Sequence, residues 1–218
     1  MVLFDLDNTL VDRAGFRRWA KNFAQDRGLD EGAVELLCVA DQNGLAPREQ
    51  VFQLACEKYH LADTVDELIA EYRASYPKLI RPDYSVAAAI RLLRTKHWRI
   101  GILTNGPPTQ REKIDRAGLT PLVDAICISA EFGIEKPEPA IFKEAVRLCG
   151  GDRDTISQGW MVGDSPVSDI AGGQSVGLRT VWLHHGRTWT EGSFSPDTIA
   201  TDVPDAVQQI LLASDEAL

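Results

Sequence analysis

The chain has 218 residues, of which 44% are hydrophobic and 25% are charged, as is typical of a soluble globular protein with one large domain or a core and a smaller insert. The formal net charge of -9 and the isoelectric point near 4.9 argue against nucleic acid or an anionic membrane as the main partner. The four cysteines contain no CxxC pair, so we expect free thiols rather than a zinc site or a disulfide framework.

The sequence begins with a short apolar run, Val2-Leu3-Phe4, that ends at Asp5. Such a run is typical of a buried parallel strand that ends at a functional loop. The first residues lack the positive start and the longer apolar run of a signal peptide, and no stretch is long and apolar enough to span a bilayer. We therefore expect a cytoplasmic protein without a targeting segment.

Residues 14–80 have a helical pattern throughout, in which aromatic side chains such as Phe16, Trp19 and Phe23 recur at helical spacing. This stretch is large enough to be a small all-α cap domain inserted after the first strand. We interpret its aromatic stripe as the core of that domain rather than as a ligand-binding face.

The rest of the chain alternates between strand and helix patterns. Four apolar runs predict further strands, at residues 99–103, 125–128, 159–162 and 179–183. Helical patterns follow at residues 85–95, 109–117, 139–148, about 167–174 and 204–212. This alternation predicts an α/β fold with a doubly wound parallel sheet. The expected core domain comprises residues 1–13 and 81–218.

Polar clusters follow four of these strands. They are Asp5-Leu-Asp7-Asn-Thr9, Thr104-Asn105-Gly106, Glu135-Lys136-Pro137, and Gly163-Asp164-Ser165 with Asp169. Each cluster alone could be a turn, a helix cap or a solvated charge. Ligands of open α/β sheets bind beyond the carboxyl ends of the strands, so four clusters in these places predict one shared site.

The acidic residues of these clusters predict a metal site. Asp5 and Asp7 are separated by one residue, and Asp164 and Asp169 reach the same edge from another strand. Carboxylates this close repel each other unless a cation lies between them. An all-oxygen site of this kind is what Mg²⁺ prefers. The Thr104 hydroxyl and the Lys136 ammonium suit phosphoryl oxygens, and Gly106 allows a tight turn that brings N–H groups near an anion.

Taken together, the four motifs resemble those of the haloacid dehalogenase-like (HAD) hydrolases. The resemblance covers essentially the whole expected core, and the insert is placed like the family's helical C1-type cap. It implies a HAD-like Rossmannoid core and a Mg²⁺-dependent phosphatase. Asp5 is then the nucleophile and a metal ligand, Asp7 is the general acid/base and lends its backbone carbonyl to the metal, and Asp164 completes the metal site.

The resemblance also assigns the remaining motif residues. Thr104 is expected to hold the transferred phosphoryl group with the Asn105 backbone nearby, and Lys136 to bridge Asp5 and the phosphate charge. Asp169 is expected to orient Lys136 or to lie in the outer shell of the metal, and Ser165 to give support at a variable position. The implied substrate is a small phosphorylated metabolite, such as a nucleotide or another acidic phosphate ester.

Four other functions stay open. A carbon–halogen hydrolase would need no Mg²⁺ and would leave Asp7 and Asp164 idle beside a negative substrate. A phosphomutase would use the same core with a different cap. A silent binding domain would be expected to lack Asp5 or Asp7, and both are present. A phosphonate-cleaving enzyme would need a Schiff-base lysine from the cap, where Lys21 and Lys58 are candidates.

Three other groups of residues receive a simpler interpretation. His184 and His185 have no further metal-ligating neighbours in sequence and are expected to lie in a loop. Trp182 and Trp189 are interpreted as packing residues. Three arginines stand where the cap begins, and they are either a solvated helix face or contacts to an acidic leaving group: Arg13, Arg17 and Arg18.

Overall fold

The computed structural model describes residues 1–12, 14–44 and 46–215. The chain divides into two compact units, of which one comprises Met1–Val11 with Pro82–Leu218 and the other Asp12–Arg81. These divisions fall within two residues of the boundaries expected from the sequence. No helix of the described residues is long and apolar enough to cross a membrane. All four cysteines are free thiols, as expected.

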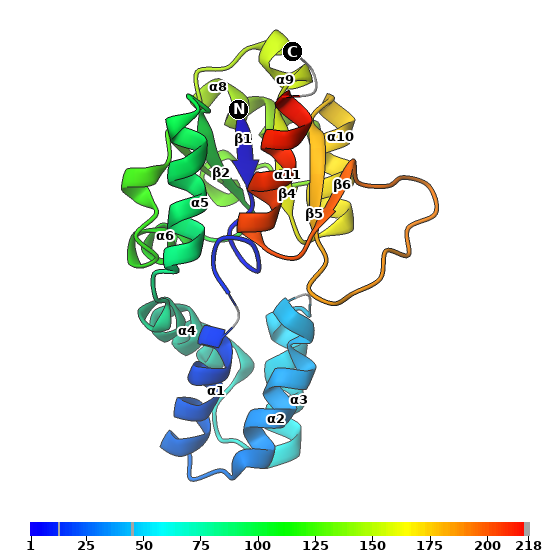
Figure 1. The fold of residues 1–218 in the computed structure, drawn as a ribbon. Coiled ribbons are helices and arrows are strands. Elements are labelled where there is room, and N and C mark those ends of the chain that lie inside the picture. Colours follow the sequence, from blue (N-terminus) through cyan, green and yellow to red (C-terminus); the bar gives the residue numbers. More distant parts are fainter. Residues whose placement is uncertain (13, 45, 216–218) are drawn as a thin grey trace. The chain divides into compact units, whose positions relative to one another are not determined.

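In the described residues, the first unit, here called the sheet unit, is built on six parallel strands in the order β3-β2-β1-β4-β5-β6 (Figure 1). Their bounds are β1 Val2–Phe4, β2 Ile100–Thr104, β3 Ala125–Ile128, β4 Trp160–Gly163, β5 Arg179–Leu183 and β6 Thr198–Ala200. The chain moves outward from β1 to β3 and then returns to the other side of β1. The strand order therefore switches direction between β1 and β4, and the predicted doubly wound α/β fold is confirmed.

Helices cover both faces of the sheet. Helices α5 (Tyr84–Thr95) and α11 (Val203–Asp215) pack against each other on one face, and α8 (Pro139–Leu148) and α10 (Gly172–Val176) pack against each other on the opposite face (Figure 1). Shorter helices are α6 Gln110–Arg116, α7 Ser129–Phe132 and α9 Arg153–Ser157. A π-helical turn, Pro166–Ala171, precedes α10 in the region where the sequence predicted one regular helix.

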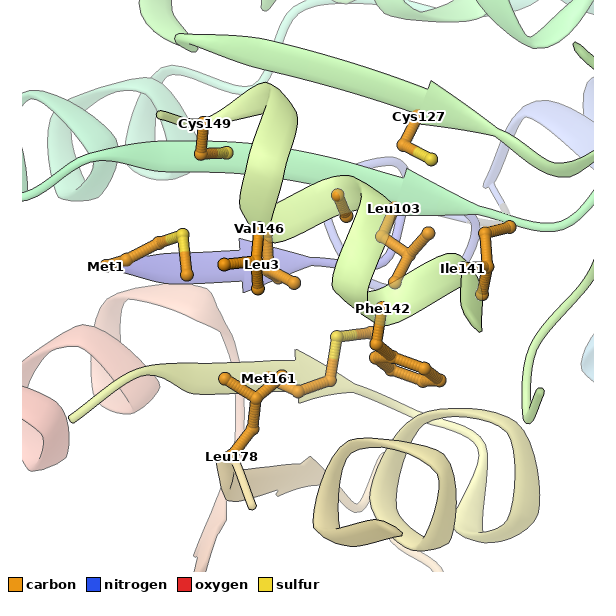
Figure 2. Close-up of a cluster of buried hydrophobic side chains, with 11 residues drawn as sticks. Met1, Leu3, Leu103, Cys127, Ile141, Phe142, Val146, Cys149, Met161 and Leu178 are labelled. Carbon is orange, nitrogen blue, oxygen red and sulfur yellow. The ribbon is translucent and has the colours of Figure 1, made fainter. Parts of the chain in front are cut away.

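The core beneath α8 explains why the strands have continuous apolar sequences. Figure 2 shows Ile141, Phe142 and Val146 of α8 together with side chains of β1, β2 and β4. The spacing of these three residues places them on one side of the helix. Successive side chains of a strand point to opposite faces of the sheet. Because both faces are covered, Leu3 and its neighbours Val2 and Phe4 are all buried.

Strand β6 was not predicted. It has only three residues and pairs only with β5 among the described strands, at the edge of the sheet. Half of the Ile199 surface, 50%, is exposed to solvent. An edge strand of this kind shows no buried apolar run in the sequence.

The second unit, here called the helical unit, has four α-helices among its described residues. Their bounds are α1 Ala14–Asp26, α2 Glu31–Ala40, α3 Arg48–Tyr59 and α4 Val65–Ser75, and short 3₁₀ turns lie at Gln42–Gly44 and Tyr76–Leu79. The predicted aromatic stripe forms its core, in which Trp19 packs against Phe23, Phe52 and Tyr72 at ring distances of 5.1, 5.6 and 5.1 Å. The Trp19 indole N–H donates to Ser75 Oγ at 2.8 Å, so the buried ring keeps a polar partner.

Candidate active site

The expected site lies where the strand order switches. Asp5 follows β1, Asp164 follows the neighbouring β4, and Thr104 ends β2 on the other side of β1. The Asp5 N–H donates to Val162 O at 2.9 Å, which fixes the chain just beyond the two central strands. All the predicted site residues therefore belong to the sheet unit, and they meet at the carboxyl edge of the sheet, as parallel strands require.

Lys136 joins two of the predicted aspartates. Its ammonium Nζ donates to Asp5 Oδ1 and to Asp169 Oδ1, both at 2.6 Å, and all three side chains are buried. Burial acts to lower the pKa of Lys136, but the carboxylates of Asp169 and Asp5 outweigh it and raise that pKa. The lysine therefore remains a cation inside the site.

Asp5 lies in an environment that resists a lone negative charge. Burial raises its pKa to about 8, although the Lys136 ammonium acts in the opposite direction. The nearby carboxylates of Asp169 and Asp164 add to the rise. A second positive charge at this point would keep Asp5 ionised and ready to act as a nucleophile.

Asp164 has partners other than Lys136. Its Oδ2 accepts from Asn8 Nδ2 and from the Arg187 guanidinium, each at 3.3 Å. Burial raises the pKa of Asp164 to about 6, and Asp169 adds to this rise. Its backbone carbonyl accepts from Trp182 Nε1 at 2.9 Å and from Arg187 at 2.7 Å, so the loop after β4 is tied to β5 and to the segment that follows it.

The geometry fits a divalent cation. Carboxylate oxygens of Asp5, Asp164 and Asp169 lie within 4.8 Å of one another, and all three residues are buried. Both oxygens of Asp169 are already engaged, because Oδ1 accepts from Lys136 and Oδ2 accepts from the Ser165 N–H at 2.9 Å. Asp5 and Asp164 are thus the better carboxylate ligands. The resemblance implied Asp5, Asp164 and the backbone carbonyl of Asp7 as metal ligands. Asp169 contacts Lys136, which is one of the two roles expected for it.

Asp7 has partners that the sequence did not reveal. Both of its carboxylate oxygens accept from Lys113 Nζ at 2.8 Å, and Oδ2 also accepts from Gln110 Nε2 at 2.8 Å. Gln110 and Lys113 belong to α6 and are buried. The same Gln110 amide donates to Thr104 Oγ1 at 2.9 Å, so Asp7 and Thr104 are connected through one side chain.

Asn105 positions Lys136 through its side chain. Its Nδ2 donates to Lys136 O at 2.9 Å, and its Oδ1 accepts from the Lys136 N–H at 2.8 Å. Two bonds to one residue fix the backbone that carries the buried ammonium. The resemblance implied a role for the Asn105 backbone near the phosphate and none for this side chain.

The glycines of the motifs leave room for functional side chains. A Cβ on Gly163 would lie 2.2 Å from Asp169 Oδ2, so only glycine fits before Asp164. Gly106 has a φ of 147°, which favours glycine. Its N–H donates to Ser129 Oγ at 3.0 Å.

The segment after β5 also contributes. His185 and Arg187 were not predicted to take part, yet His185 Nε2 lies 2.6 Å from Asn8 O and Arg187 contacts Asp164. Burial lowers the pKa of His185, which favours a neutral ring that donates to this carbonyl. Asn8, in the turn that carries Asp7, has a φ of 62°.

Ser165 has a local role, because its Oγ accepts from the Ser168 N–H at 3.2 Å and begins the π-helical turn.

Two of the three arginines noted at the start of the insert have partners within the helical unit. Arg17 forms ion pairs with Glu35 and Glu31, and Arg18 donates to Leu79 O at 3.1 Å. Arg13 lies outside the described residues.

Known proteins are similar to this chain over most of its length. The sequence model of the haloacid dehalogenase-like hydrolases matches residues 1–177. The phosphoserine phosphatase of Thermus thermophilus is 33% identical, over 72% of this chain and 62% of that protein. The N-acylneuraminate-9-phosphatase of Mus musculus is 31% identical, over 93% of this chain and 90% of that protein. The magnesium-bound HAD-hydrolase YfnB of Bacillus subtilis has the same fold, with a TM-score of 0.78, 21% identity and coverage of 96% and 97%.

Proposed function

The chain belongs to the haloacid dehalogenase-like hydrolase family, and from this premise we propose that it is a Mg²⁺-dependent phosphatase that forms an aspartyl-phosphate on Asp5. The curated relatives are named as phosphatases. The observation that carries the proposal is the buried Asp5–Lys136 pair at the switch point, with Asp164 beside it. The proposed nucleophile Asp5, the cation Lys136 that balances its charge, and the second proposed metal ligand Asp164 thus lie together within the sheet unit.

The first half of the reaction is a phosphoryl transfer to Asp5. A carboxylate oxygen of Asp5 attacks phosphorus, and the bond from phosphorus to the ester oxygen breaks. Lys136, which already contacts Asp5, also meets the negative charge of the phosphoryl oxygens, and the Thr104 hydroxyl donates to one of them. A Mg²⁺ ion held by Asp5, Asp164 and the backbone carbonyl of Asp7 would offset the remaining phosphoryl charge.

Proton transfer is assigned to Asp7. Its carboxyl group gives a proton to the departing alkoxide, and the resulting carboxylate then takes a proton from the water that hydrolyses the acyl-phosphate. The contacts of Asp7 with Gln110 and Lys113 support a role for this side chain beyond that of a solvated turn. A carbon–halogen hydrolase would give neither Asp7 nor Asp164 a task, so the phosphatase is the better reading of this site.

The substrate is proposed to be a small phosphomonoester whose leaving group carries a carboxylate or another negative charge. Phosphoserine and N-acylneuraminate 9-phosphate, in the names of the two relatives, both carry a carboxylate besides the phosphate. The four motifs account for the phosphoryl group, the metal and the protons, and none lies within Asp12–Arg81. We assign selection of the leaving group to this helical unit, as a cap domain.

The test combines a screen of phosphate esters with trapping of the covalent intermediate. Mg²⁺ should restore hydrolysis to chelator-treated protein, and wild type should form an acid-stable phosphoprotein that Asp5→Asn does not form. Asp154→Asn, an exposed carboxylate on α9, is the matched control and should behave as wild type. Full turnover in excess EDTA would remove the metal from the proposal, and labelling of Asp5→Asn at the wild-type rate would place the nucleophile elsewhere.

A further inference from the structure

The structure assigns to Gln110 and Lys113 the role of holding two groups in place for the proposed phosphatase reaction. These groups are the proton-transferring carboxylate of Asp7 and the phosphate-binding hydroxyl of Thr104. The inference rests on the proposed function. It makes Gln110 and Lys113 positioning residues, which act through Asp7 and Thr104 and do not touch the reacting atoms.

Gln110 connects the two groups with a single amide. Its Nε2 lies 2.8 Å from Asp7 Oδ2, 2.9 Å from Thr104 Oγ1 and 3.3 Å from Asn105 O. Only 2% of the residue is exposed, so water does not compete for these bonds. Because the amide nitrogen carries two hydrogens, the two shortest contacts use both donors. Gln110 therefore fixes the distance between Asp7 and Thr104.

The same contact sets the direction of the Thr104 hydroxyl. A hydroxyl has one hydrogen to donate, and Gln110 donates to the Thr104 oxygen. The Thr104 hydrogen must therefore point to another acceptor. Within the protein it donates to Asn105 O at a long 3.3 Å. A phosphoryl oxygen would be a stronger, charged acceptor, so Gln110 leaves Thr104 prepared to donate to phosphate.

Lys113 holds the carboxylate of Asp7 from α6. Its ammonium is 2.8 Å from both oxygens, and only 11% of the lysine side chain is exposed. Charge-assisted bonds to both oxygens fix the plane of the carboxylate. They also stabilise the charge that appears on Asp7 when its proton moves to the leaving alkoxide. In the second half of the reaction, the same carboxylate accepts the proton of the attacking water.

Two further observations support this arrangement. Gln110 and Lys113 are three residues apart on α6, so their side chains lie on one side of the helix. A Cβ on Gly106 would lie 3.0 Å from both Cγ and Cδ of Gln110. The glycine of the Thr104-Asn105-Gly106 motif thus leaves the space in which Gln110 lies. The motif and the helix form one device around Asp7.

The test uses two esters that differ in their need for a proton. Alkyl phosphates have poor leaving groups that require the acid, whereas 2,4-dinitrophenyl phosphate does not. Lys113→Gln should lower kcat/KM for the alkyl ester about 10- to 100-fold, the scale of a misplaced catalytic group. It should change kcat/KM for the dinitrophenyl ester less than about threefold, while phosphoprotein accumulates because the base is misplaced. Arg116→Gln, which removes an exposed cation from the same helix, is the matched control and should match wild type.

Gln110→Met tests the second contact. It should give the same ester selectivity and should also weaken inhibition by inorganic phosphate, because Thr104 loses its partner. In an Asp7→Asn background, Lys113→Gln should cause no further loss, whereas Gln110→Met should keep its effect on phosphate inhibition. If Lys113→Gln does not fold, the Gln110→Met arm decides alone. Equal losses on both esters, no loss on either, or undiminished losses in the Asp7→Asn background would overturn the inference.

The proposed function and the inference fail in different ways. Wild type that forms no phosphoprotein, or that hydrolyses both esters in excess EDTA, contradicts the proposed function itself. Wild type that is labelled on Asp5, together with variants of Gln110 and Lys113 that show no ester selectivity, contradicts only the inference.

Discussion

Replacing Asp164 by asparagine should make the metal-free protein more stable at pH 8, although it should abolish activity. Burial raises the pKa of Asp164 from 3.8 to about 6 in the folded state. A carboxyl group with a raised folded-state pKa contributes its stability at low pH and loses it as the pH rises from the unfolded value through the folded one. The ionised carboxylate therefore lowers the free energy of unfolding of the metal-free protein at pH 8. A neutral amide at this position does not have this destabilising effect.

The magnitude follows from the size of the shift. About two pKa units at 1.36 kcal/mol each correspond to roughly 3 kcal/mol at pH 8, and to about 1 kcal/mol at pH 4.5. The substitution loses little in return, because the Asn8 and Arg187 contacts to Oδ2 are long, at 3.3 Å each. Arg187 also keeps its bond to the Asp164 carbonyl. We expect a net gain of about 2–3 kcal/mol at pH 8.

Urea unfolding in EDTA measures this difference, with tryptophan fluorescence from Trp160 and Trp182 in the sheet unit as the signal. Added Mg²⁺ should stabilise wild type and leave Asp164→Asn unchanged, because an ion that binds only the folded state adds stability. Asp154→Asn should be neutral throughout. An Asp164→Asn protein that is less stable than wild type in EDTA at pH 8, or a difference that is the same at pH 4.5 and pH 8, would refute the assigned pKa and its cause.

Three other substitutions test further contacts, two in the sheet unit and one in the helical unit. Asn105→Ala removes both bonds to the Lys136 backbone, so it should cost about 2–4 kcal/mol in urea unfolding and also lower kcat; an unchanged midpoint would show that the loop holds Lys136 without it. Gly163→Ala places a Cβ 2.2 Å from Asp169 Oδ2 and should lower activity at least about tenfold by displacing Asp169 from Lys136, whereas Gly192→Ala, with open space around it, should match wild type. A Gly163→Ala enzyme with wild-type kcat would show that Asp169 can move freely. Arg18→Ala should raise KM for the preferred acidic ester and leave the KM for p-nitrophenyl phosphate unchanged. Arg17→Ala should change neither KM, because Glu35 and Glu31 already pair with Arg17. Equal losses on both esters would instead indicate a folding defect of the helical unit.

The fold could be predicted because its signals are local. Apolar runs such as Val2–Phe4 and the run at residues 100–103 are short, continuous and followed by polar residues, which is typical of strands buried on both faces. Strand β6 escaped because an edge strand with the half-exposed Ile199 needs no such run. The π-helical turn before α10 was not distinguished from an α-helix, because the spacing of apolar residues in one short turn does not separate the two hydrogen-bond patterns.

The candidate site could be predicted where residues lie directly after strands. Asp5, Thr104 and Asp164 are placed by the backbone itself, since parallel strands bring their carboxyl ends to one edge. Asp169 was placed in two possible roles, and its contact with Lys136 depends on the missing side chain of Gly163. That contact is decided by packing, so the sequence alone left the alternatives open.

Gln110 and Lys113 could not be found in this way, because polar residues on a short helix are normally solvated. The helical pattern at residues 109–117 gives both an ordinary exposed interpretation. Lys113 is buried because α6 begins just after the Thr104-Asn105-Gly106 turn, which brings its first turns beside Asp7. A buried lysine requires a carboxylate partner, and the Asp7 turn supplies one. The helix that follows a strand-end motif is therefore where positioning residues should be sought in a chain with this architecture.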